Sequence, residues 1–315
     1  MFQVRTDLAL ETREKFDEDH IEVKGVRVDE ERISPEIMIT RVFIDTENGA
    51  KAMKKPKGTY ITIEASDMME EDEDYHREVS GQLAKVIETM LPGKKDELKI
   101  LVVGLGNREV TPDALGPYVV DNMIITRHII KEYGQYAFGN KVRSQISGIV
   151  PGVMAQTGME SGEIVRGVIE ETKPDIVIVV DALAARSVKR LNRTIQITDT
   201  GINPGSGVGN HRHAINKESM GIPVIAIGIP TVVDAATIVS DTMSDLIGAM
   251  RESAQLKSVG NGLAGLDEIE KHELARELLS PHLNAMFVTP KDIDEAVKRL
   301  SYTISEGLNL AFSRF

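Results

Sequence analysis

Three short apolar segments constrain the fold of this chain more than any other feature of its sequence. Each is a run of Val, Ile, Leu or Ala that ends at a glycine or an aspartate: residues 100–103 before Gly104, 176–180 before Asp181, and 224–227 before Gly228. Such runs are typical of strands buried on both faces of a parallel sheet. Helical patterns lie between and after them, and this alternation favours an α/β fold with a mainly parallel sheet flanked by helices.

The helical patterns have recognisable ends. Residues 75–91 are expected to form a helix that Pro92 and Gly93 terminate. Residues 157–160 resemble a capping box, and the apolar residues that follow it have helical spacing. Residues 265–312 are also expected to be helical, with one apolar face made of Ile293, Ala296, Val297, Leu300 and Ile304.

The first third of the chain is rich in charge. Residues 11–32 are expected to be irregular, whereas the β-branched segments 37–44 and 59–64 are expected to pair like a hairpin with a long connection. The acidic run 70–74 is interpreted as a solvated face. We therefore divide the chain into an N-terminal extended and helical segment packed on the core (8–98), an α/β catalytic core (99–250) and a C-terminal helical region (251–315).

The composition limits the chemistry and the partners. The 315 residues include no cysteine and no tryptophan, and the net charge is −12. Without cysteine there are no disulfides, thiolate nucleophiles or Cys-based metal sites. The negative charge and the scarcity of aromatic residues disfavour nucleic-acid binding. We find no apolar run long enough to span a membrane and no signal-peptide pattern, so an intracellular soluble protein is expected.

Glycine-rich segments follow the apolar runs but match no nucleotide-binding motif. After Gly104 and Gly106 the third glycine of a dinucleotide fingerprint is replaced by Glu109, and the ending of a P-loop is missing. The segment 205–209 is not placed between a strand and a helix as a nucleophile elbow would be. We interpret these glycines as tight turns or close backbone contacts.

Two aspartates are the candidate catalytic residues. Asp113 lies in the loop after the first apolar run, and Asp181 ends the second. Because ligands bind beyond the carboxyl ends of parallel strands, both side chains are expected in one crevice. Two adjacent carboxyl groups share a proton, so such a pair can activate water and protonate a leaving amine. The alternatives are a helix cap for Asp113 and a structural role for Asp181.

The motifs around these residues resemble those of the germination protease family. They are residues 4–9, 104–107, 110–117, 151–154, 181–187, 198–210 and 221–234. The resemblance implies an α/β fold similar to that of hydrogenase maturation proteases, with an added α+β subdomain. It also implies an endopeptidase that degrades small acid-soluble spore proteins during germination. In this family the catalytic pair corresponds to Asp113 and Asp181. The resemblance implies no metal and no other cofactor.

The same resemblance implies a self-processing zymogen. Family substrates are cut after an acidic residue and before a bulky apolar residue that alanine follows, and residues 6–9 have this form. We therefore predict a propeptide of residues 1–7 and a cut between Asp7 and Leu8. A homotetramer in the cytoplasm of the developing spore core is also implied.

Supporting roles are expected for residues close to the two aspartates. Backbone amides of the segment that contains Gly104, Gly106 and Asn107, or of the loop 201–209, are candidates to stabilise an oxyanion. Arg186 is expected either to orient a carboxylate or to form a structural ion pair.

Two other functions stay open at this point. A metal-dependent hydrolase would use Asp113 and Asp181 as ligands, with His211 or His213. A non-catalytic protein would hold an anionic ligand in its glycine loops.

Overall fold

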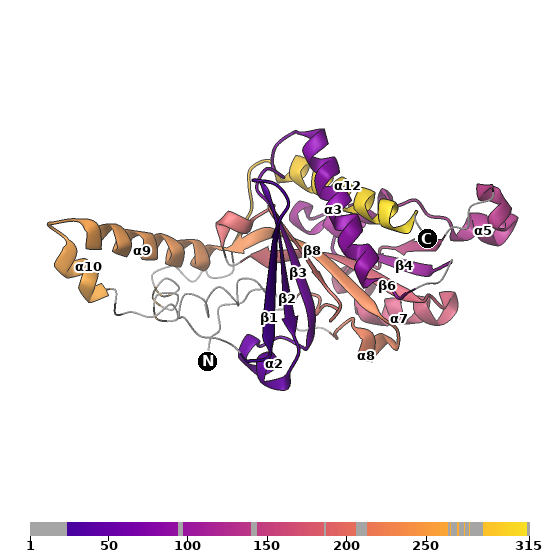
Figure 1. The fold of residues 1–315 in the computed structure, drawn as a ribbon, viewed down its shortest axis with the longest axis horizontal. Helices are drawn as coiled ribbons and strands as arrows, with labels where there is room; N and C mark the ends of the chain where they lie inside the picture. Colours follow the sequence, from indigo (N-terminus) through magenta and orange to yellow (C-terminus); the bar gives the residue numbers. More distant parts are fainter. Residues whose placement is uncertain are drawn as a thin grey trace.

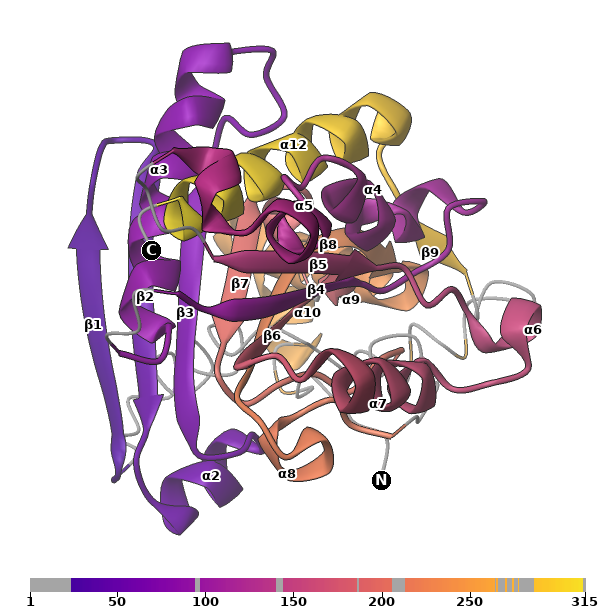
Figure 2. The ribbon, with the colours of Figure 1, turned by 90° about the vertical axis from the view of Figure 1, so that its right-hand side faces the viewer.

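The computed structural model describes residues 24–93, 97–139, 144–185, 187–205, 213–263 and 286–313, together with residues 265, 270, 274 and 277. One mixed sheet runs through the molecule, and helices pack on both of its faces (Figures 1 and 2). Within the described residues the sheet has nine strands in the order β1-β2-β3-β7-β8-β6-β4-β5, and β9 pairs with β8. The expected α/β class is therefore confirmed.

The parallel half of the sheet contains the three apolar runs. Its strands are β4 (Lys99–Gly104), β5 (Gln145–Ile149), β6 (Ile176–Ala185) and β8 (Val224–Asp234). β4 pairs with β5 and β6, and β6 pairs with β8. The prediction that the strands end at Asp181 and Gly228 was wrong, because both strands continue and stay paired with each other beyond these residues.

The other half of the sheet is antiparallel and comes mainly from the N-terminal segment. Its strands are β1 (Val26–Arg32), β2 (Ile37–Ile44), β3 (Gly58–Ala65) and β7 (Thr194–Thr198). The expected pairing of β2 with β3 is confirmed, and helix α2 (Glu47–Met53) lies in their connection. The prediction of irregular structure was wrong for β1. This strand forms the edge of the sheet, where its charged side chains reach solvent while its backbone stays paired with β2.

One face of the sheet is covered by α3 (Glu73–Met90), α4 (Leu115–Asp121) and α12 (Ile293–Phe312) (Figure 2). The Asp72 carboxylate caps α3, which agrees closely with the expected helix. The five residues expected on the apolar face of the C-terminal helix are all buried in α12. The expectation that the helix begins at 265 was wrong for residues 286–292, because β9 (Phe287–Val288) pairs there with β8.

The opposite face is covered over β4 and β6 by α7 (Ser161–Thr172). The capping box was predicted one turn too early. Thr157 ends the short helix α6 (Met154–Thr157), whereas Glu160 caps α7 and forms the box with Glu163. Beyond α7, the same face over β8, β7 and β3 borders the cavity described below.

The remaining helices lie around this core. They are α5 (Arg127–Tyr133), α8 (Lys217–Met220), α9 (Ala235–Glu252) and α10 (Lys257–Leu263). Helix α9 continues directly from β8, and with α10 it projects from the body of the molecule (Figure 1). In the described part of the chain, no helix has the length and apolar character needed to cross a membrane.

Candidate active site

A cavity of about 550 Å³ lies on the sheet face beyond α7. Its floor is a row of residues that face one another across three strands. Asp181 of β6 lies opposite Gly228 of β8, which in turn lies opposite Gln196 of β7. Residues opposite one another on paired strands share a face of the sheet. A side chain at Gly228 would clash with its neighbour, because a Cβ there would lie 2.5 Å from Cγ of Leu183.

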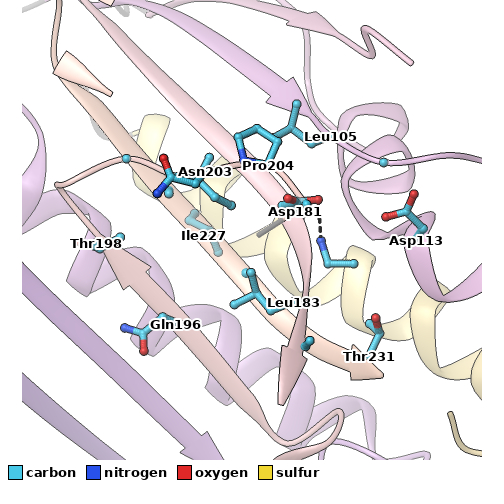
Figure 3. Close-up of a pocket in the computed structure, with 18 of the residues that line it drawn as sticks. Leu105, Asp113, Asp181, Leu183, Gln196, Thr198, Asn203, Pro204, Ile227 and Thr231 are labelled. Carbon is cyan, nitrogen blue, oxygen red and sulfur yellow. Dashed lines mark hydrogen bonds between the residues drawn. The ribbon is translucent and has the colours of Figure 1, made fainter. Parts of the chain in front are cut away.

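Asp181 lies at the centre of this cavity (Figure 3). It follows five buried apolar residues of β6 and is itself only 7% exposed. Its Oδ1 accepts a hydrogen bond of 3.0 Å from the backbone N–H of Ala182. The strand thus holds a carboxyl group in the sheet directly after an apolar run, where it lines the cavity.

Asp113 reaches the same cavity from a different element. It is half-buried and ends the 3₁₀ segment η1 (Thr111–Asp113). The backbone N–H of Asn107 donates to its Oδ2 at 2.8 Å and to its carbonyl oxygen at 3.1 Å. The alternative role as a helix cap is not observed, because Ala114 is the N-cap of α4 and that cap makes no side-chain hydrogen bond. The structure therefore brings both predicted aspartates to one cavity.

The glycines next to Asp113 are required by close packing. A Cβ at Gly104 would lie 2.2 Å from the carbonyl oxygen of Gly116. Gly106 has a φ of +115°, and a Cβ there would lie 1.9 Å from the carbonyl oxygen of Asp113. Only glycine tolerates both the backbone conformation and this approach. The expected importance of these glycines thus has a structural basis.

Two backbone amides of the loop that was expected to stabilise an oxyanion make hydrogen bonds within the protein. The N–H of Leu105 donates to the carbonyl oxygen of Val180 at 2.8 Å, and the N–H of Asn107 donates to Asp113. These two amides hold the loop and the aspartate in place, whereas the role predicted for Gly106 stays a prediction. Residues 201–205 of the second glycine loop line the cavity, whereas 206–209 lie outside the described residues.

Several predicted residues lie outside the described part of the chain or away from the cavity. Asp7, Leu8, Arg186 and His211 belong to the first group. His213 belongs to the second: its exposed ring places Nδ1 2.6 Å from Oε2 of Glu160. Within the described ranges, no group of three or more His, Asp or Glu side chains is arranged to hold a metal ion.

Two cavity residues were missed by the sequence analysis. Lys55 is the one residue with a basic side chain among the described residues that line the cavity. It follows α2, and its Nζ lies 5.8 Å from the ring centre of Tyr60. Burial raises the pKa of Tyr60 to about 12, so its phenol stays neutral next to the lysine at neutral pH.

The second missed residue is Thr231. It is 1% exposed, and its hydroxyl donates to the carbonyl oxygen of Pro112 at 2.7 Å. Lys55 belongs to no motif, and Thr231 lies within the motif 221–234 but was given no role there; each comes to the site from a part of the sequence distant from Asp113.

Comparison with known proteins identifies the family. Residues 4–257 match the family described as germination protease. The chain belongs to the germination protease family. A germination protease of Caldanaerobacter subterraneus subsp. tengcongensis is 50% identical, over 98% of this chain and 94% of the relative. One from Clostridium perfringens strain SM101 is 45% identical, over 99% and 95%, and one from Bacillus mycoides is 40% identical, over 98% and 94%.

Family membership makes this chain a protease and disfavours the non-catalytic alternative. A solved structure of a NiFe hydrogenase maturation protease from Thermococcus kodakarensis is also similar, with 19% identity and a TM-score of 0.32. That alignment covers 71% of this chain and 98% of the other. A likeness of this strength carries no argument about the fold, which rests on the sheet and helices described above.

Proposed function

We propose that this protease is an endopeptidase that initiates the degradation of small acid-soluble spore proteins during germination, and that Asp113 and Asp181 activate the attacking water. One observation carries the mechanism: two carboxyl groups from separate elements line one cavity. Membership of the germination protease family supports spore proteins as the substrate class. A peptide that enters the cavity would meet both carboxyl groups.

In the proposed reaction the two carboxyl groups share one proton. The ionised group accepts a proton from water as the water oxygen attacks the scissile carbonyl carbon. The protonated group donates its proton to the carbonyl oxygen in the same step. The group that took the proton from water then donates it to the leaving nitrogen, and the other group takes back a proton from a hydroxyl of the tetrahedral intermediate as the C–N bond breaks, so the pair again holds one proton. A coupled pair titrates as a unit, and we therefore assign the acid and base roles to the pair as a whole.

The proposal includes self-processing between Asp7 and Leu8, with residues 1–7 as the propeptide. The cavity offers a partner for an acidic residue before the cut, because the ammonium group of Lys55 carries the opposite charge. It also has apolar lining residues that suit the bulky residue after the cut, namely Leu105, Val110, Val153 and Leu183.

We further propose that the protein assembles as a homotetramer in the spore core. Exposed apolar side chains on the projecting α9 and α10, and in the turn between them, are consistent with burial against another copy. They are Leu246, Leu256, Val259 and Leu263.

Substitution of the two aspartates tests the mechanism. Asp113→Asn and Asp181→Asn keep the side-chain shape and remove the acid–base function. Each variant is expected to lose cleavage of a purified small acid-soluble spore protein by at least about 100-fold, the usual share of acid–base catalysis. Asp74→Asn, at an exposed position on α3, is the matched control and should cleave normally. Normal cleavage by either site variant, with thermal unfolding unchanged, would remove the aspartate pair from the proposal.

A further inference from the structure

Strand β8 contains an irregularity directly beside the cavity. Leu183 of β6 pairs with Pro230, but the next residue, Ala184, pairs with Val232. Thr231 is therefore an extra residue that has no counterpart on β6. Such bulges turn a side chain away from the direction that regular pairing would give it. Pro230 fits this position because it has no N–H to contribute to the ladder.

The bulge directs Thr231 toward the segment that carries Asp113. The Thr231 hydroxyl donates to the carbonyl oxygen of Pro112 at 2.7 Å, and Pro112 is joined to Asp113 by the next peptide bond. Figure 3 shows Thr231 and Asp113 on the same side of Asp181. Because Thr231 is almost fully buried, no water can replace this bond if the hydroxyl is removed.

The C-terminal segment fixes the bulge from the other side. The Thr289 hydroxyl donates to the carbonyl oxygen of Thr231 at 2.8 Å. Thr289 follows β9, whose residues Phe287 and Val288 pair with the end of β8. Phe287 and Thr289 also line the cavity. This segment lies beyond residue 257, where the family match ends.

We propose that Thr231 is a positioning residue for Asp113, and that Thr289 holds Thr231 in place so that the C-terminal segment helps to align the catalytic pair. The inference rests on the proposed function, since it assigns a role through Asp113. Asn107 fixes the carboxyl group of Asp113 from one side, and Thr231 fixes the main chain just before it from another. Neither threonine exchanges a proton with the substrate.

Removal of the hydroxyl separates this role from simple packing. Thr231→Val keeps the shape of the side chain, whereas Thr231→Ser keeps the hydroxyl. We expect Thr231→Val to lower kcat by about 10- to 100-fold with KM nearly unchanged, because small displacements of a catalytic group have costs of this size. Thr231→Ser should restore most of kcat. Thr289→Val should lower kcat in the same way by a smaller factor.

Thr126→Val is the matched control. Thr126 is also buried, and its hydroxyl donates to the carbonyl oxygen of Ser144 at 2.6 Å; neither residue lines the cavity. This variant should lose thermal stability and keep kcat. The readouts are kcat and KM with a purified small acid-soluble spore protein, and thermal unfolding of each full-length variant.

The possible results are decisive for the two threonines. A folded Thr231→Val variant with normal kcat overturns the proposal, and so does a Thr231→Ser variant as slow as Thr231→Val. If Thr231→Val does not fold, the half-buried Thr289 decides: a folded Thr289→Val variant with normal kcat overturns the proposal, and a lowered kcat at unchanged KM supports it. An active Asp113→Asn variant would instead overturn the proposed aspartate pair, and this positioning role with it.

Discussion

The backbone N–H of Asn107 donates hydrogen bonds to two oxygens of Asp113, the carboxylate Oδ2 at 2.8 Å and the carbonyl oxygen at 3.1 Å. One amide thus fixes the positions of both the side chain and the main chain of a candidate catalytic residue. The arrangement depends on the preceding Gly106, which approaches the same carbonyl oxygen with a positive φ. Any side chain at position 106 would occupy the space that Asp113 needs.

Gly106→Ala is therefore expected to inactivate the protease. The new Cβ would lie 1.9 Å from the carbonyl oxygen of Asp113, so the main chain has to move and the carboxyl group moves with it. Cleavage should fall by about 100-fold or more, and the free energy of unfolding should fall by about 1–3 kcal/mol from backbone strain. Cleavage of a spore protein and urea unfolding measure the two effects.

Gly81→Ala is the matched control for that substitution. Gly81 lies within α3, and a Cβ there would meet no atom within 4 Å. Alanine should raise the stability by about 0.5–1 kcal/mol and leave cleavage unchanged. Normal cleavage by Gly106→Ala would show that the position of Asp113 is not critical.

Elements with a regular pattern were predictable from the sequence, and those that depend on distant partners were not. The pair β2 and β3 and helix α3 have clear local patterns and clear ends. β1 was missed because its charged residues look irregular until the strand is seen at the edge of the sheet. The extensions of β6 and β8 beyond Asp181 and Gly228 depend on their pairing with each other.

The candidate site shows the same division. Asp113 and Asp181 were predicted to share a crevice because each follows an apolar run that was interpreted as a parallel strand. Both line the cavity, although Asp181 lies within β6 and not at its end. Thr231 was not predicted, since its contact with Pro112 joins residues 119 positions apart through a bulge in β8. Lys55 reaches the cavity only because β3 pairs with β7 in the assembled sheet. No pattern within either segment signals these contacts.

Lys55→Met is expected to weaken the preference for an acidic residue before the cut. Lys55 lines the cavity, and its ammonium group would pair with the substrate carboxylate. For the unmodified enzyme, kcat/KM should be about 10- to 100-fold higher for a peptide with Glu at that position than for one with Gln. This factor corresponds to the contribution of one hydrogen bond to a charged group. In the variant this difference should nearly disappear.

Lys51→Met is the control for the loss of one positive charge. Lys51 lies on the neighbouring helix α2, is exposed and does not line the cavity. Its variant should keep the preference for Glu over Gln. An unchanged preference in Lys55→Met would assign recognition of the acidic residue to another group.

Exhaustive chelation is expected to leave cleavage unchanged. A metal-dependent mechanism would need ligands in addition to Asp113 and Asp181, and the described residues provide no cluster of three or more. His213 lies at the protein surface and pairs with Glu160 instead. Activity after treatment with chelator should equal that of the untreated protein, and elemental analysis should find no stoichiometric metal. Loss of activity that added zinc or another divalent ion restores would favour the metal-dependent alternative.

Self-processing is expected to remove the first seven residues. The sequence around Asp7 and Leu8 has the form of a substrate, so the matured protein should begin at Leu8, as N-terminal sequencing would show. Asp7→Lys should prevent the cut, because a lysine there would repel the Lys55 ammonium group in the cavity.

Asp181→Asn should also stay unprocessed when incubated alone. Addition of a small amount of active enzyme would then show whether one molecule can cut another: a new N-terminus at Leu8 in the inactive variant means that its cleavage site is accessible, and that only its own catalytic pair was missing. A matured N-terminus at any other residue would contradict the predicted site.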